Sequence, residues 1–189
     1  MLLSQLTLPD GSRAVAMRED AQTEARIVPG TTSTYELALA AIAAGHDLAT
    51  EIAARGAGDP VDLAAAMAEG RMLLPLDHTD PAHLHLTGTG LTHLGSASAR
   101  DAMHQKPLAP EEMTDSMKMF RMGLEGGRPG AGQIGAQPEW FYKGNGHSAA
   151  APGQPLTSPG FALDAGEEPE LAGLYIIAPD GRPFRLGFA

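Results

Sequence analysis

Residues 164–177 read Asp164-Ala165-Gly166-Glu167-Glu168-Pro169-Glu170-Leu171-Ala172-Gly173-Leu174-Tyr175-Ile176-Ile177. Four carboxylates fall within the first seven of these residues, and the apolar run that follows has the composition of a strand. Because successive side chains of a strand point to opposite faces, Glu168 and Glu170 are expected on the same side. Pro169 lies between them and lacks a backbone N–H, which favours the edge or the entry of a strand.

This acidic stretch has two interpretations. Two carboxylates so close together repel each other unless a proton or a cation lies between them. One interpretation is therefore half of a site for a hard cation, with oxygen ligands suited to Mg²⁺, Mn²⁺ or Ca²⁺. The other is a solvated acidic loop that leads into a strand. The stretch alone leaves both open.

Composition excludes several classes of protein. The chain has 189 residues, which suits one ordinary domain, or a small domain with part of another. A net charge of -10 and scattered basic residues argue against a nucleic-acid partner. Without cysteine there are no disulfides, thiolate metal sites or cysteine nucleophiles. No apolar run reaches membrane-spanning length and the start lacks a signal-peptide pattern, so we expect a soluble, cytoplasmic protein with no membrane partner.

The first part of the chain predicts a β-hairpin followed by helices. Strands are expected at 2–8 and 13–17, because Pro9 and Gly11 favour a turn between them. A third short strand is expected at 26–28.

Three helices should follow. Ser33 and Glu36 form a capping box for a helix that stops at Gly45, and a second helix is expected at about 47–55. Asp59 as cap and Pro60 as first helical residue predict the third. Residues 1–80 are therefore predicted to form a small α+β domain, and they contain no cluster of reactive side chains.

The next stretch of interest is rich in histidine, glycine and hydroxyls. His83 and His85 would share one face of a strand, either as metal ligands or as its solvated side. The loop at 88–96 lacks the third glycine of a dinucleotide fingerprint. Its backbone N–H groups and hydroxyls, Thr89 among them, are suited to holding a carboxylate or sugar acid, with His93 placed to move a proton. Alternatively, its glycines simply permit a tight turn.

The later segments add one cationic candidate and one hairpin. The aromatic residues at 140–142 alternate sides in a predicted strand that ends at Lys143. Lys143 is either a partner for an anionic substrate or an ordinary solvent-facing lysine. Residues 174–177 and 184–189 predict a β-hairpin around 179–182.

Taken in order, four segments of the chain resemble the fumarylacetoacetate hydrolase superfamily, and within it the bacterial sugar-acid branch. The segments are Gly88-Thr89-Gly90-Leu91-Thr92-His93-Leu94-Gly95-Ser96, Thr114-Asp115-Ser116-Met117-Lys118-Met119-Phe120, Pro138-Glu139-Trp140-Phe141-Tyr142-Lys143-Gly144 and Gly166-Glu167-Glu168-Pro169-Glu170-Leu171-Ala172-Gly173-Leu174-Tyr175. The likeness covers most of the chain and is strongest from about residue 81 onward.

The resemblance implies a fold and a site. The fold would be a small N-terminal α+β domain (1–80) followed by the beginning of a mixed β-roll (81–189). Glu168 and Glu170 correspond to the Glu-x-Glu pair that, with a downstream Asp, holds a divalent cation, Mg²⁺ first and Mn²⁺ or Ca²⁺ as alternatives. Lys143 falls on the Lys of the family's Phe-x-Lys strand, and family members are commonly homodimers.

Two departures from the family pattern bear on activity. His93 is followed three residues later by Ser96 rather than Glu, so the His–Glu pair that activates water in the hydrolases is not matched. Moreover, Asp180 is the only Asp after Glu170, and it falls in a predicted tight turn unsuited to a metal ligand. The chain therefore resembles the N-terminal part of a longer enzyme, and alone it is expected to be inactive.

These features lead to the hypothesis of a metal-dependent dehydratase that acts on a 2-keto-3-deoxy sugar acid in pentose catabolism. His93 and Lys143 are its candidate catalytic residues, and Thr89 and Lys143 its candidate substrate-binding residues. The alternatives are a hydrolase that cleaves a diketo acid, and an inactive fragment or interaction module whose exposed strands pair with another chain.

Overall fold

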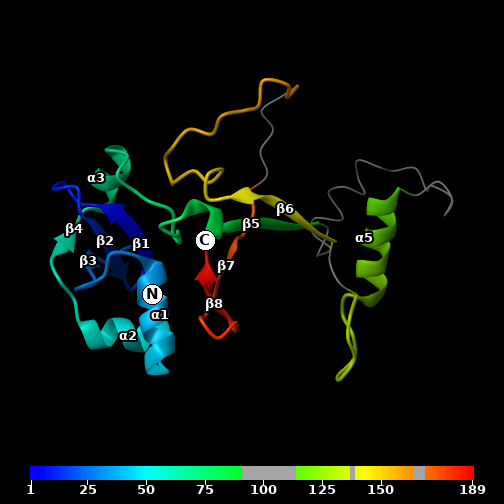
Figure 1. The fold of residues 1–189 in the computed structure, drawn as a ribbon, viewed down its shortest axis with the longest axis horizontal. Helices are drawn as coiled ribbons and strands as arrows, with labels where there is room; N and C mark the ends of the chain where they lie inside the picture. The colour runs from blue at the N-terminus through cyan, green and yellow to red at the C-terminus, as the bar shows by residue number, and fades with distance from the viewer. Residues whose placement is uncertain (91–113, 137–138, 164–168) are drawn as a thin grey trace. The chain divides into compact units, whose positions relative to one another are not determined.

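The computed structural model describes residues 1–90, 114–136, 139–163 and 169–189. Within these ranges the chain is an α+β protein with four α-helices, one short 3-10 helix and three antiparallel sheets (Figure 1). The residues group into two compact units, one formed by Met1–Leu84 with Gly146–Ala189 and the other by His85–Asn145. The division into folding domains at residues 80 and 81 stays a prediction.

The larger unit is built on a four-stranded sheet in the order β1–β2–β3–β4. Its strands are β1 (Leu2–Thr7), β2 (Arg13–Arg18), β3 (Ala25–Ile27) and β4 (Pro60–Val61). β1 pairs with β2 along its whole length, and Gly11 adopts a φ of 85° in the connecting turn. The Asp10 carboxylate accepts hydrogen bonds from both the backbone N–H and the hydroxyl of Ser12. The predicted hairpin is confirmed.

Helix α1 (Thr34–Ala44) begins at its predicted cap, Ser33, and α2 (Leu48–Arg55) lies within the range predicted for the second helix, with Asp47 as its cap. The Ser33 hydroxyl and the Asp47 carboxylate each accept a hydrogen bond from the backbone N–H three residues later, at 3.1 Å and 2.7 Å. α1 ends at Gly45 in the left-handed conformation. No single helix in the described ranges is long and apolar enough to cross a membrane. α1 and α2 together meet that test, but the chain bends by 101° between them.

The third helix begins later than predicted. Pro60 and Val61 form β4, and α3 (Leu63–Ala68) is capped by Asp62, so the assignment of Asp59 as cap and Pro60 as first helical residue is wrong. A proline suits both the start of a helix and an edge strand, because neither requires its N–H. Pairing with β3 in the folded sheet decides between the two.

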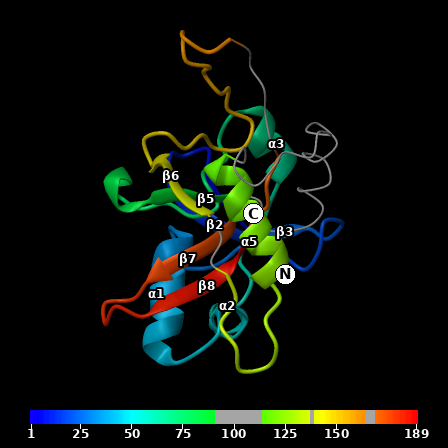
Figure 2. The same ribbon diagram turned by 90° about the vertical axis from the view of Figure 1, so that its right-hand side faces the viewer.

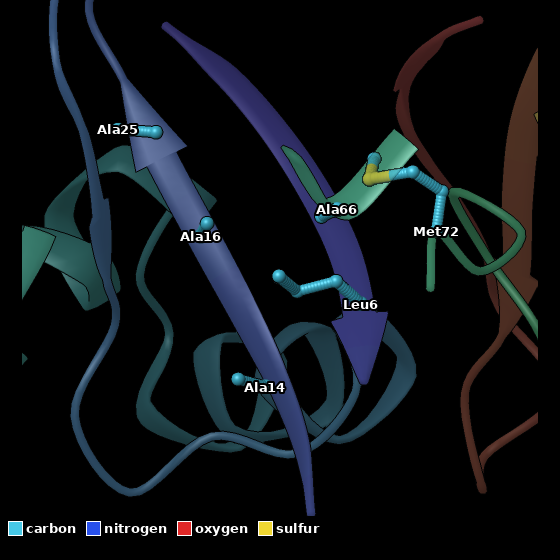
Figure 3. Packing of buried hydrophobic residues seen from close by; sticks show 6 residues of the cluster. All are labelled: Leu6, Ala14, Ala16, Ala25, Ala66 and Met72. Atoms are coloured by element: carbon cyan, nitrogen blue, oxygen red, sulfur yellow. The ribbon is translucent and has the colours of Figure 1, made fainter. Parts of the chain in front are cut away.

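The sheet carries hydrophobic residues on both faces. One core cluster, drawn in Figure 3, contains Leu6, Ala14, Ala16, Ala25, Ala66 and Met72. A second cluster contains Val15, Val28, Leu37 and Ile52. Successive residues of β2 therefore point to opposite faces, toward α3 on one side and toward α1 and α2 on the other. This explains why a continuous apolar run is buried in β2.

The C-terminal hairpin belongs to the same unit. It consists of β7 (Gly173–Ile177) and β8 (Pro183–Phe188), which confirms the predicted hairpin. Figure 2 shows both strands beside α1. Ile176, only 5% exposed, forms a third cluster with Ala38 of α1 and with Leu76. Residues from both ends of the chain thus share one core.

The smaller unit contains β5 (His85–Gly90), β6 (Glu139–Asn145) and α5 (Asp115–Gly126).

The predicted strand that would place His83 and His85 on one face is wrong at its start. His83 closes the 3-10 helix η1 (Pro81–His83), where Asp80 caps the turn, and the strand begins only at His85. The two histidines therefore do not share a strand face.

Candidate functional site

Two of the sequence motifs meet in the antiparallel pair β5–β6. Gly88 lies opposite Phe141, and Thr89 lies opposite Trp140. The register shifts between Leu86 and Thr87, whose partners are Gly144 and Tyr142, so Lys143 is the extra residue of a β-bulge. Bulges change the direction in which a side chain leaves a strand, and here the bulge falls on the candidate lysine.

Gly88 is buried beneath two side chains of β6. A Cβ at Gly88 would lie 2.7 Å from Cε of Lys143 and 2.7 Å from two ring carbons of Phe141. The Lys143 ammonium lies 5.6 Å from the centre of the Phe141 ring, a distance that permits a cation–π interaction. The absence of a side chain at 88 thus makes room for the lysine stem and the ring on one face of the pair.

The opposite face carries hydroxyl and aromatic groups. Thr87 and Thr89 point to this side with Trp140 and Tyr142, which are 63% and 55% exposed. The Tyr142 ring packs edge-to-face against His85, with ring centres 6.1 Å apart. The two candidate substrate-binding residues, Thr89 and Lys143, therefore emerge on opposite faces of β5–β6.

Of the two candidate metal ligands, only Glu170 lies within the described residues. Glu170 is exposed and precedes β7 in a segment without regular secondary structure, so the strand expected through it is wrong there. The ladder of the hairpin extends only to Ala172, which exchanges two hydrogen bonds of 2.9 Å with Ala189. Glu168 and the catalytic candidate His93 lie outside the described residues.

Among the described residues, no group of three or more His, Asp or Glu side chains is placed to hold a metal ion. The carboxylates of Glu168 and Glu170 are hard oxygen donors, which fit Mg²⁺ or Ca²⁺ better than soft metals. Asp180 serves the β7–β8 turn instead. Hydrogen bonds from Arg182, first its backbone N–H and then its side chain, hold the pKa of that carboxyl below its usual range.

Sequence reasoning missed the contact between Gly88, Phe141 and Lys143. Two signals pointed to it: a glycine inside a strand indicates a bulge or a close approach of neighbouring groups, and a glycine follows Lys143. That second glycine, Gly144, adopts a φ of 134°, which an ordinary side chain rarely allows.

Comparisons of the chain with protein-family models, with curated proteins and with solved structures found no match.

Proposed function

We propose that the chain belongs to a metal-dependent lyase of the fumarylacetoacetate hydrolase type, which removes water from a 2-keto-3-deoxy sugar acid. In this proposal β5 and β6 are strands of the mixed β-roll. The observation that carries it is the pairing of two motifs about fifty residues apart in sequence, with Gly88 beneath Lys143 and Phe141. One motif is the hydroxyl-rich loop that begins at Gly88, and the other is the strand that carries Lys143. Their pairing restricts the positions that the Lys143 side chain can occupy.

Lys143 would bind the carboxylate of the substrate. Its stem passes over Gly88 and its ammonium lies near the Phe141 ring, which limits the directions in which the charge is presented. A compact ammonium is suited to pairing with a carboxylate. The proposal does not use the Thr89 hydroxyl, because that side chain emerges on the opposite face.

Glu168 and Glu170 would hold the divalent cation, since the oxygen donors of this pair fit a hard metal. When bound, such a cation withdraws electrons from a keto group and makes the neighbouring C–H more acidic. The reaction requires a base that takes the proton from C3 and an acid that assists departure of the C4 hydroxyl as water, leaving a C3–C4 double bond. His93 is the candidate for one of these proton transfers.

The test is a calorimetric titration of the full chain with 2-keto-3-deoxypentonate in the presence of Mg²⁺, because binding of the substrate carboxylate by Lys143 does not require the chain alone to be active. We expect binding that is lost in Lys143→Ala and retained in Lys118→Ala. Lys118 is a matched control because it is an exposed lysine that forms an ion pair with Asp115 of its own helix.

Two results would contradict the proposal: no binding of the sugar acid by the unmodified chain, or equal affinity in both lysine variants. Tighter binding of a diketo acid than of the sugar acid would favour the hydrolase alternative.

A further inference from the structure

We propose that a pocket beside β4 binds a small organic ammonium ion, an amine whose positive charge is carried on an apolar body. The pocket has a volume of about 550 Å³, which falls within the range of small-molecule sites. Its lining includes three aliphatic side chains, Leu8, Ile27 and Val61, and three prolines, Pro9, Pro29 and Pro60. We call it the β4 pocket.

The apolar part of the β4 pocket is held in place by the core. Leu8, Ile27 and Val61 are half-buried and pack against the cluster drawn in Figure 3. The Gly58 backbone N–H donates a 2.8 Å hydrogen bond to the Ile27 carbonyl, and a Cβ at Gly58 would lie 3.0 Å from that oxygen. The three prolines fix their backbone φ angles, which limits how far the exposed rim of the pocket can move and lowers the entropic cost of binding.

The charged groups of the β4 pocket favour a cation. Arg71 is already engaged: its Nε donates to the Glu69 carboxylate at 2.7 Å, and its Nη1 donates to the Thr7 carbonyl at 2.8 Å. The Asp62 carboxylate caps α3. The Asp59 carboxylate has no hydrogen-bond or ion-pair partner among the described residues.

Arg26 donates to the Gly58 carbonyl at 3.2 Å and is paired with Glu24 at 2.7 Å. Because the charges of Arg71 and Arg26 are opposed by Glu69 and Glu24, the two aspartates leave an excess of negative charge beside an apolar surface. A ligand that matches both features is an amphipathic ammonium ion. A carboxylate or phosphate would meet this excess negative charge with Arg71 already engaged. The site uses none of the residues assigned to the proposed lyase, so each proposal can fail without the other.

The experiment is a titration of the ¹⁵N-labelled full chain at neutral pH with cyclohexylammonium, cyclohexanol and cyclohexanecarboxylate. These probes share one apolar body and differ in charge. We expect the ammonium to bind most tightly, to shift the amides of Ile27, Gly58 and Val61, and to weaken as salt is added. Asp59→Asn should weaken its binding about fivefold, the effect of losing one exposed ion pair.

Asp180→Asn is the matched control, since it removes the same charge outside the β4 pocket, and it should leave the affinity unchanged. Thermal unfolding by circular dichroism checks that both variants fold. The proposal is overturned if cyclohexanol binds as tightly as the ammonium, if the carboxylate binds more tightly, or if the shifts fall elsewhere. The probe series in the unmodified chain decides this even if Asp59→Asn fails to fold.

Discussion

Gly88 defines the surroundings of two other residues by having no side chain. Replacing it with Ala should destabilise the β5–β6 pair by about 1 kcal/mol, because the new methyl would displace the outer atoms of Phe141 and Lys143. Gly187→Ala in β8 is the matched control, since nothing lies within 4 Å of a Cβ built there. Urea denaturation should show the control unchanged or slightly more stable. Equal losses in the two variants would mean that the close approach at Gly88 does not constrain the strands.

Gln5 is a fully buried polar side chain that joins three segments. Its amide nitrogen donates to the Leu74 carbonyl at 2.5 Å and to Asp77 at 3.1 Å, and its oxygen accepts from the Thr34 backbone N–H at 2.6 Å. Gln5→Met keeps the volume but leaves the Thr34 N–H, at the start of α1, without its acceptor.

We expect Gln5→Met to lower the free energy of unfolding by about 1–3 kcal/mol, the cost of a buried unpaired donor. Gln22→Met, at an exposed turn position, should change it by less than about 0.5 kcal/mol. Urea denaturation of both variants measures the difference, and a Gln5→Met chain as stable as Gln22→Met would show that water replaces the lost bonds.

At the scale of elements, α2 should show a measurable pH dependence. Hydrogen bonds from Thr50, first its side chain and then its backbone N–H, hold the pKa of Asp47 below its ordinary value. A carboxyl with a lowered folded pKa stabilises the fold above the unfolded pKa, about 3.9, and loses that contribution as the pH falls through the folded value. Asp47→Asn still caps the helix but does not titrate.

Thermal unfolding of the unmodified chain and Asp47→Asn between about pH 2 and pH 7 tests this prediction. The advantage of the unmodified chain should be largest near neutrality and should shrink in acid. An advantage that grows as the pH falls would have the wrong sign for a capping carboxylate.

Local sequence signals predicted several turns and helix starts, but not which strands pair or in what register. Pro9 and Gly11 determine a turn over four residues, and Ser33 satisfies a donor three residues away, so both features can be recognised in the sequence. Pro60 fits either of two local structures, and only pairing with β3 makes it a strand. The bulge at Lys143 likewise depends on the register with β5, which no single segment contains.

At the scale of the whole molecule, the motifs of the candidate site were predictable from local sequence, but their relative positions were not. The motifs that became β5 and β6 were recognised from sequence as chemically suggestive, yet their alignment was not predictable, because strand register is set by partners far along the chain. That register places Thr89 and Lys143 on opposite faces. Glu168 and His93 stay predictions, as both lie outside the described residues.

The shared core of the larger unit makes a prediction about cooperativity. Ile176 of β7 is buried against Ala38 of α1, whereas its neighbour Ile177 is 61% exposed. Ile176→Ala should therefore cost about 2–5 kcal/mol, and Ile177→Ala less than about 1 kcal/mol. Because the two changes remove the same atoms from adjacent residues, they separate packing from strand propensity.

Hydrogen exchange locates the effect of these substitutions. If the hairpin and α1 unfold as one cooperative unit, Ile176→Ala should speed exchange in α1 and α2 as well as in β7 and β8. Faster exchange confined to the hairpin would show that β7 and β8 dock on a core that is stable without them. Ile177→Ala should leave exchange in α1 unchanged in either case, because its side chain lies on the exposed side of β7 while α1 packs against the other.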